Sequence, residues 1–232
     1  MKWSTCGRVH TYIATRPERL LSLLYDARMD EEIKAQRDET SDSWKHGSRR
    51  SRVLTPGEIT MAALLFGDSI DYSRVRIHAR RYMPFQPKNC CMTPNGSMYF
   101  HRSCFLPDYS LGSPSAVHWF QHEMAHVWQH QLGYAVRFRG AVRIGLSYDY
   151  DLAPGKTLAD FNMEAQGDLL ADYFILKHLR SPVSMRHQRY AGSLPLYEKV
   201  LAGFIADPSD VESLPRDYGR YIALLKDWKG SR

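Results

Sequence analysis

Hydrophobic and polar positions divide the chain into two parts. From Asp30 to Arg52 almost every residue is polar, whereas regular apolar spacing begins after Thr55. A segment this polar cannot bury enough apolar surface to fold alone. We therefore expect residues 1–52 to be a polar, basic N-terminal extension or linker, with a possible short helix over Arg19–Met29. Residues 53–232 are expected to form the folded domain.

Cap signals mark the helices of this domain. Thr55-Pro56-Gly57-Glu58 is a capping box with proline at the first helical position, and Ser113-Pro114 pairs an N-cap serine with the same proline signal. Thr157, with Asp160 three residues later, marks a third start. The predicted helices cover residues 56–66, 114–132, 157–179, 195–206 and 214–229.

Two short segments show the alternation of a β-strand. They are Val75–His78 and Ser97–His101, and the second follows an Asn95-Gly96 turn. They could pair in one sheet, and residues 134–156 read as loop. The expected fold class is α+β, mostly helical, with a small sheet packed against the second helix.

Composition and charge narrow the function classes. The net charge is +6, but residues 1–52 carry half of it and the rest is dispersed, so a nucleic-acid partner is not expected. No apolar run is long enough to span a membrane, and no classical signal peptide is present. We expect cytoplasmic residence in the producing cell, or delivery by a dedicated secretion system.

The four cysteines do not form a recognisable framework. Cys6, Cys90, Cys91 and Cys104 show no CxxC spacing. Unbridged thiols in a reducing compartment are the expectation, although a bridge from Cys104 to Cys90 or Cys91 stays open.

The chemistry of the chain centres on an HExxH motif within the second helix. Residues four apart in an α-helix differ by about 40° in direction and about 6 Å in height, so His122 and His126 can bind one zinc ion together. Glu123 points beside such an ion. There it can act as general base, taking a proton from an activated water and passing it to a leaving amine.

The third helix supplies the remaining ligand. Glu164, Asp168 and Asp172 share one face beside apolar residues, which is unfavourable unless something positive opposes them. We predict that Glu164 completes the zinc site. Asp168, one turn on, is placed to accept the second ring N–H of His122 or His126.

Other side chains receive weaker assignments. His118 and His130 are expected to be packing or surface residues, and the spacing after His126 does not give the third histidine of metzincins. Tyr148 is the preferred donor to a developing oxyanion. The alternatives for that donor are Tyr150, His178, His187 and Tyr190. The strand over Met98–His101 could be an edge that pairs with an extended peptide.

These residues carry two resemblances to known proteins, one broad and one more specific. HExxH followed by a helix carrying ExxxD is similar to the gluzincin branch of zinc metallopeptidases. The stretches LTPGEI, FGDSIDYSRVRIH, TPNGSMYF and WFQHEMAHVWQHQLG resemble metallopeptidase domains of VgrG-related and Rhs-associated type VI secretion proteins and of contractile injection systems. The similarity covers about residues 54–180.

The resemblance implies a zincin-like fold and a toxin or effector delivered into other cells. It also implies a protein or peptide substrate, a VgrG- or Rhs-type partner and an immunity protein. Two alternatives from other classes remain. One is a cytosolic SprT-like protease acting near nucleic acid, and the other is a non-catalytic adaptor with a zincin fold.

Overall fold

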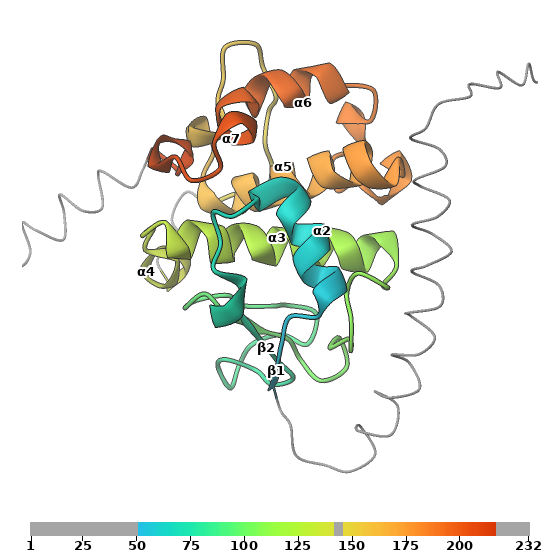
Figure 1. Cartoon of the computed structure of the whole chain (residues 1–232), viewed down its shortest axis with the longest axis vertical. Helices are drawn as coiled ribbons and strands as arrows, with labels where there is room; N and C mark the ends of the chain where they lie inside the picture. Colours follow the sequence, from blue (N-terminus) through green and yellow to red (C-terminus); the bar gives the residue numbers. More distant parts are fainter. Residues whose placement is uncertain (1–50, 142–145, 217–232) are drawn as a thin grey trace, which may run out of the picture. The chain divides into compact units, whose positions relative to one another are not determined.

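The computed structural model describes residues 51–141 and 146–216 (Figure 1). Within them the fold is α+β, as the sequence predicts, with a small three-stranded sheet at one end of a mainly helical domain (Figure 1). Most of the predicted extension, Cys6, the predicted helix over Arg19–Met29 and residues 217–229 of the last predicted helix lie outside the described residues. Residues 214–216 are not helical.

The sheet has the order β1-β2-β3. Strand β1 (Ser51–Val53) pairs antiparallel with β2 (Arg76–His78), and β2 pairs parallel with β3 (Met98–Tyr99). The two strands expected to pair therefore do so, and Ser51 and Arg52 of the predicted extension add a third.

The outer edge of β3 is already hydrogen-bonded to another segment of the chain. Tyr99 exchanges both backbone hydrogen bonds with Met92 (2.9 and 3.3 Å), and its carbonyl also accepts from the Gln86 side chain at 2.8 Å. The expectation that the Met98–His101 strand offers a free edge to a peptide is therefore wrong at Tyr99.

Helix α2 (Pro56–Phe66) begins with the predicted capping box. Thr55 Oγ1 accepts from the Glu58 N–H, and the Glu58 carboxylate accepts from the Thr55 N–H. The same buried carboxylate receives both ends of the Arg52 guanidinium at 2.7 Å and the Tyr109 N–H at 2.8 Å. One side chain thus ties together β1, α2 and the segment that precedes the HExxH helix.

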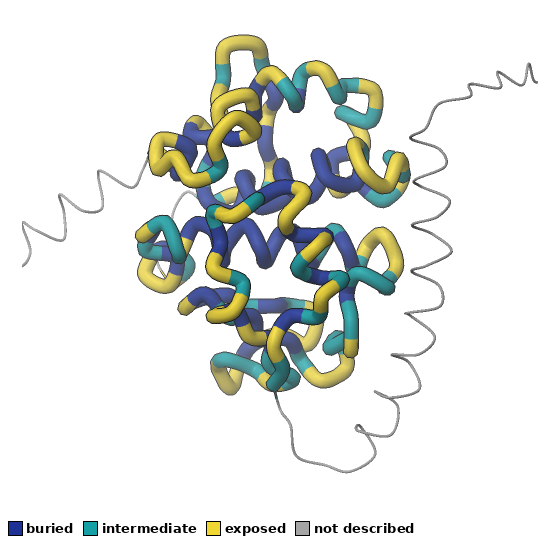
Figure 2. The backbone as a smooth tube through the Cα atoms, viewed as in Figure 1, coloured by how far each residue is buried: buried dark blue, intermediate teal, exposed yellow. Residues whose placement is uncertain are grey.

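The HExxH helix, α3 (Pro114–Gln131), runs through the core. Ser113 caps it as predicted, and Gly133, with φ +93°, follows its C-terminal end. Phe120, Met124 and Trp128 are fully buried. Helix α5 (Met163–Phe174) lies alongside α3 (Figure 1), and both occupy the buried centre of the domain (Figure 2).

The predicted start of the third helix is wrong by six residues. Thr157 and Asp160 form their capping box around a single 3₁₀ turn, Leu158–Asp160, after which Phe161 is extended (φ −105°, ψ 145°). Helix α5 begins instead at Met163, because Asn162 Oδ1 accepts from the N–H groups of Glu164 and Ala165. A π-helical turn, Ile175–Leu179, continues α5 to the predicted end.

The remaining helices are short. Helix α4 (Val136–Ala141) lies within the predicted loop, and α6 (Leu194–Val200) and α7 (Ala202–Ala206) fill the predicted 195–206 segment. The other 3₁₀ turns are Tyr72–Arg74, Pro182–Ser184, Gln188–Tyr190 and Val211–Ser213. Among the described residues, no helix combines the length and apolar character needed to cross a membrane. No disulfide joins Cys90, Cys91 and Cys104.

Candidate metal centre

Three buried side chains converge where α3 meets α5. The Nε2 atoms of His122 and His126 are 3.1 Å apart, and each lies 3.3 Å from Oε2 of Glu164. The three residues are 5–7% exposed. Their ligand atoms could hold one metal ion, so the structure brings together the three residues predicted as ligands.

The second nitrogen of each ring fixes which atom faces the centre. His122 Nδ1 lies 2.8 Å from Asp168 Oδ1, and His126 Nδ1 lies 2.8 Å from Gln129 Oε1. Both partners are acceptors, so each Nδ1 carries the hydrogen and each neutral ring turns the Nε2 lone pair inward. Two lone pairs and a carboxylate oxygen then face one another, which requires a proton or a cation between them.

The pKa values of these three groups also favour a positive charge at the centre. Burial disfavours protonation of His122, but hydrogen bonds to Asp168 and Glu164 outweigh it and raise the pKa of His122 to about 10. Burial also opposes protonation of His126, yet the Glu164 carboxylate raises its pKa. The two imidazoles in turn hold the pKa of Glu164 well below its usual range, against the effect of burial.

Glu123 lies next to this centre and not in it. Its carboxylate is 4% exposed and accepts a hydrogen bond of 2.5 Å from Thr93 Oγ1, in the turn that leads into β3. Burial and the charge of Glu123 raise the pKa of the Cys91 thiol, which lies beside the same carboxylate. Glu123 lines two neighbouring cavities, so its carboxylate can meet a bound molecule.

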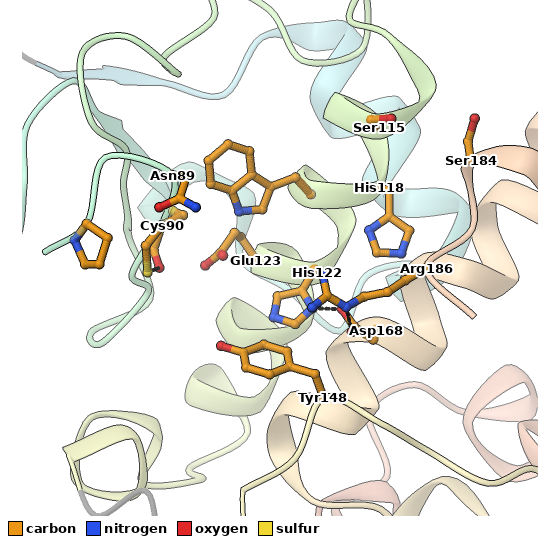
Figure 3. Close-up of a pocket in the computed structure, with 13 residues that line it drawn as sticks. Asn89, Cys90, Ser115, His118, His122, Glu123, Tyr148, Asp168, Ser184 and Arg186 are labelled. Atoms are coloured by element: carbon orange, nitrogen blue, oxygen red, sulfur yellow. Dashed lines mark hydrogen bonds and ion pairs between the residues drawn. The ribbon is translucent and has the colours of Figure 1, made fainter. Parts of the chain in front are cut away.

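Tyr148 reaches the same space from the loop between α4 and α5. Its ring stacks near His122, with centroids 5.8 Å apart, and the guanidinium carbon of Arg186 lies 5.4 Å from the Tyr148 ring centre. Figure 3 shows His122 between Glu123 and the Arg186 guanidinium, with the Tyr148 ring below it.

The other oxyanion donors considered from the sequence are engaged elsewhere. Tyr150 donates to Asp172, and His187 contacts the same carboxylate. The Tyr190 hydroxyl bonds Asp151, and His178 lines a separate cavity near α7. Tyr148 is therefore the only one of the five candidates that lines the cavities at the metal centre.

Asp172 forms a buried network one turn beyond Asp168. Its carboxylate accepts from His118 Nε2 at 2.9 Å, from the Tyr150 hydroxyl at 2.6 Å and from the backbone N–H groups of Arg186 and His187 at 2.5 and 2.9 Å. His118, expected to be a packing or surface residue, thus binds Asp172 and also lines the pocket. His130 packs against Gly96 in the turn before β3.

Four residues that shape the centre were not predicted from the sequence. Gln129 lies three residues after His126, at a spacing that points to the same helix face, so a signal existed. Gly167 is a glycine inside a helix, which often marks close approach. Thr93 and Arg186 lie in irregular segments, and no sequence spacing connects them to the motif.

Comparisons with known proteins agree on one relative. No family model matches the chain. The type VI secretion system spike protein VgrG2b of Pseudomonas aeruginosa is 45% identical over 150 residues, which are 62% of this chain and 15% of that protein. The solved effector domain of Pseudomonas aeruginosa VgrG2b is 43% identical, with a TM-score of 0.53, over 63% of this chain and 86% of that domain.

Proposed function

This chain belongs to the family of the VgrG2b effector domain, and we propose that it is a type VI secretion effector that hydrolyses peptide bonds as a zinc metallopeptidase. The observation that carries the proposal is the convergence of His122, His126 and Glu164 beside the carboxylate of Glu123. We also propose that the fold is zincin-like.

The donor set fits a zinc ion. Tetrahedral zinc with bonds of about 2.0–2.1 Å has ligand atoms about 3.3 Å apart. The three separations here, 3.1, 3.3 and 3.3 Å, match that spacing. Two imidazoles and one carboxylate with a fourth position for water are also the ligand set of catalytic zinc sites. When bound, a zinc ion would supply Lewis-acid chemistry that activates a water molecule for attack on a peptide carbonyl.

The chain's own residues would supply the proton transfers and the orientation. The Glu123 carboxylate would take a proton from the attacking water and pass it to the leaving amine, held in place by the Thr93 hydroxyl. Asp168 and Gln129 would keep the two histidine rings oriented. The Tyr148 hydroxyl would donate to the carbonyl oxygen as negative charge develops on it.

The biological setting is proposed from the family. The chain spans 15% of the length of the spike protein that it matches, so delivery by the secretion apparatus, a VgrG-type partner and an immunity protein are all proposals. A DNA-directed protease would instead bind DNA with strongly salt-dependent affinity. A non-catalytic adaptor would lack stoichiometric zinc.

A cleavage assay tests the proposed activity. Purified protein loaded with zinc should cleave unfolded protein substrates, and zinc removal by a chelator should abolish cleavage. Glu123→Gln should keep its zinc and lose at least about a hundredfold in rate, the low end of general acid–base contributions. Equal cleavage by wild type and Glu123→Gln would refute the assigned base, and zinc-loaded protein without any cleavage would refute the peptidase activity.

A further inference from the structure

The two cavities at the metal centre are adjacent and share part of their walls, so we call them the two arms of one cleft. One has a volume of about 820 Å³ and the other about 580 Å³, and both include His122, Glu123 and Tyr148 in their walls. A peptide placed with its scissile bond at Glu123 can therefore reach both arms. The side chains of the two arms differ in polarity and charge, so each arm favours a different kind of substrate group.

The larger arm is mainly apolar. Its walls include Met83 and Phe85 from the loop after β2, Val136 from α4 and Met163 from the start of α5. Phe85 is 92% exposed and Met83 49%, so both present apolar surface to solvent at this arm. Exposed apolar side chains gathered at a cavity are typical of a site that buries an apolar group of a ligand. Arg137 is an exposed member of the same arm.

The smaller arm carries one strong cation. Among the described residues that line it, Arg186 is the single lysine or arginine, and Glu123 and Asp168 are its carboxylates. Asn89, Ser115 and Ser184 add neutral polar side chains (Figure 3). Its Nε lies 2.8 Å from Asp168 Oδ2, and the side chain is 57% exposed. The pairing with Asp168 uses one edge of the guanidinium, so the remaining N–H groups can meet a carboxylate in the cleft.

Two carboxylates of α5 hold Arg186 in this place. Asp172 accepts the Arg186 backbone N–H at 2.5 Å, and Asp168 pairs with its side chain. The guanidinium carbon lies over the Tyr148 ring, 5.4 Å from the ring centre. A guanidinium held by two contacts, on a backbone that is itself anchored, is preorganised, which lowers the entropy that binding a charged group would cost. Asp172 thereby acts as a positioning residue for Arg186.

We propose that the cleft selects peptides with a bulky apolar side chain on one side of the scissile bond and a carboxylate, from Asp, Glu or a chain terminus, on the other. Arg186 binds that carboxylate, and the arm formed by Met83, Phe85, Val136 and Met163 binds the apolar side chain. This substrate preference rests on the proposed peptidase function.

Paired peptides test the preference. Each pair carries Phe or Leu on one side of the bond and differs only in Glu or Gln on the other, in both orientations along the chain. In one orientation, zinc-loaded wild type should cleave the Glu peptide with kcat/KM about tenfold higher, the value of one charge-assisted hydrogen bond. Arg186→Gln should reduce this ratio to about one. Arg137→Gln, the matched change in the apolar arm, should keep the ratio.

Binding gives a second measure that does not depend on turnover. Fluorescence anisotropy with the Glu123→Gln protein should show the same preference for the Glu peptide, and the double variant with Arg186→Gln should lose it. Cleavage with no Glu preference in either orientation would overturn this inference and leave the peptidase function intact. A preference that survives Arg186→Gln would overturn the role of Arg186. Zinc-loaded protein that cleaves no peptide would overturn the peptidase function and the preference together.

Discussion

The imidazole of His122 lies directly on the backbone of Gly167. A Cβ atom at residue 167 would lie 2.7 Å from both Nδ1 and Cε1 of that ring, closer than real Cβ contacts allow. Glycine therefore permits α5 to approach α3 closely enough for Asp168, the next residue, to accept from His122 at 2.8 Å. The geometry of the metal centre depends on a position that carries no functional group.

Gly167→Ala should weaken zinc binding. Alanine normally stabilises a helix interior by up to about 1 kcal/mol relative to glycine, but here the added methyl group must displace the His122 ring. Zinc affinity measured by competition with a chelator should fall about tenfold or more, in the range seen when the support of a ligand is disturbed. Gly203→Ala in α7, where nothing lies within 4 Å, is the matched control and should not change it. Unchanged affinity in Gly167→Ala would contradict this reading.

Gln129→Leu should also lower zinc affinity. The change removes the acceptor that holds His126 Nδ1 and also the hydrogen bonds that Gln129 donates to the Met163 carbonyl and the Gln166 side-chain oxygen. A loss of about 10- to 100-fold is expected for a residue that orients a metal ligand. Gln131→Leu, two residues along the same helix and bonded to Asp71 away from the centre, should leave zinc affinity as it is. An equal loss in both variants would point to general damage to α3.

The residues of the metal centre were more predictable than their surroundings. The four-residue spacing alone puts His122 and His126 on one face, and Glu164 and Asp168 stand out as carboxylates in an otherwise apolar helix. The structure places all four in contact.

The misses have physical causes. Thr157 and Asp160 do form a capping box, but a box can close a single 3₁₀ turn, and the extended Phe161 interrupts the helix. Thr93 and Arg186 reach the centre through turns whose path depends on tertiary packing, which periodicity does not encode. The edge of β3 was expected to be free, but Met92 pairs with Tyr99. This pairing was missed because Met92 forms an isolated bridge with no strand pattern of its own.

Thr93→Val tests whether the hydroxyl prepares Glu123 for proton transfer. Valine keeps the shape of threonine but cannot donate to the carboxylate, which now accepts at 2.5 Å. We expect kcat to fall about tenfold with zinc content unchanged, because a single hydrogen bond to a charged group contributes about 1.5 kcal/mol or more. Thr60→Val, an exposed position on α2, serves as the control. Equal kcat in both variants would remove Thr93 from the mechanism.

Asp172→Asn should destabilise the domain in a pH-dependent way. Burial alone would raise the pKa of Asp172, but hydrogen bonds from His118 and Tyr150 outweigh it and lower that pKa. A lowered folded pKa contributes stability above the unfolded value, near 3.9, which is lost as the pH falls through the folded pKa. At pH 7 the variant should lose roughly 3 kcal/mol in urea unfolding.

The difference in unfolding free energy between wild type and Asp172→Asn should shrink below about pH 4, as the wild-type carboxyl takes up its proton. Asp210→Asn, an exposed carboxylate that caps only a 3₁₀ turn, should show a much smaller difference at every pH. A difference for Asp172→Asn that stays constant from pH 7 to pH 3 would show that shape, and not charge, sets its cost.

The zinc content of the purified full chain tests the central claim most directly. Wild type should hold about one zinc per chain by elemental analysis, and Glu164→Ala should lose most of it while remaining folded by circular dichroism. Glu198→Ala, a half-exposed glutamate paired with Lys177, should keep the wild-type content. Folded wild type that takes up no zinc, or Glu164→Ala that retains all of it, would contradict the proposed metal centre.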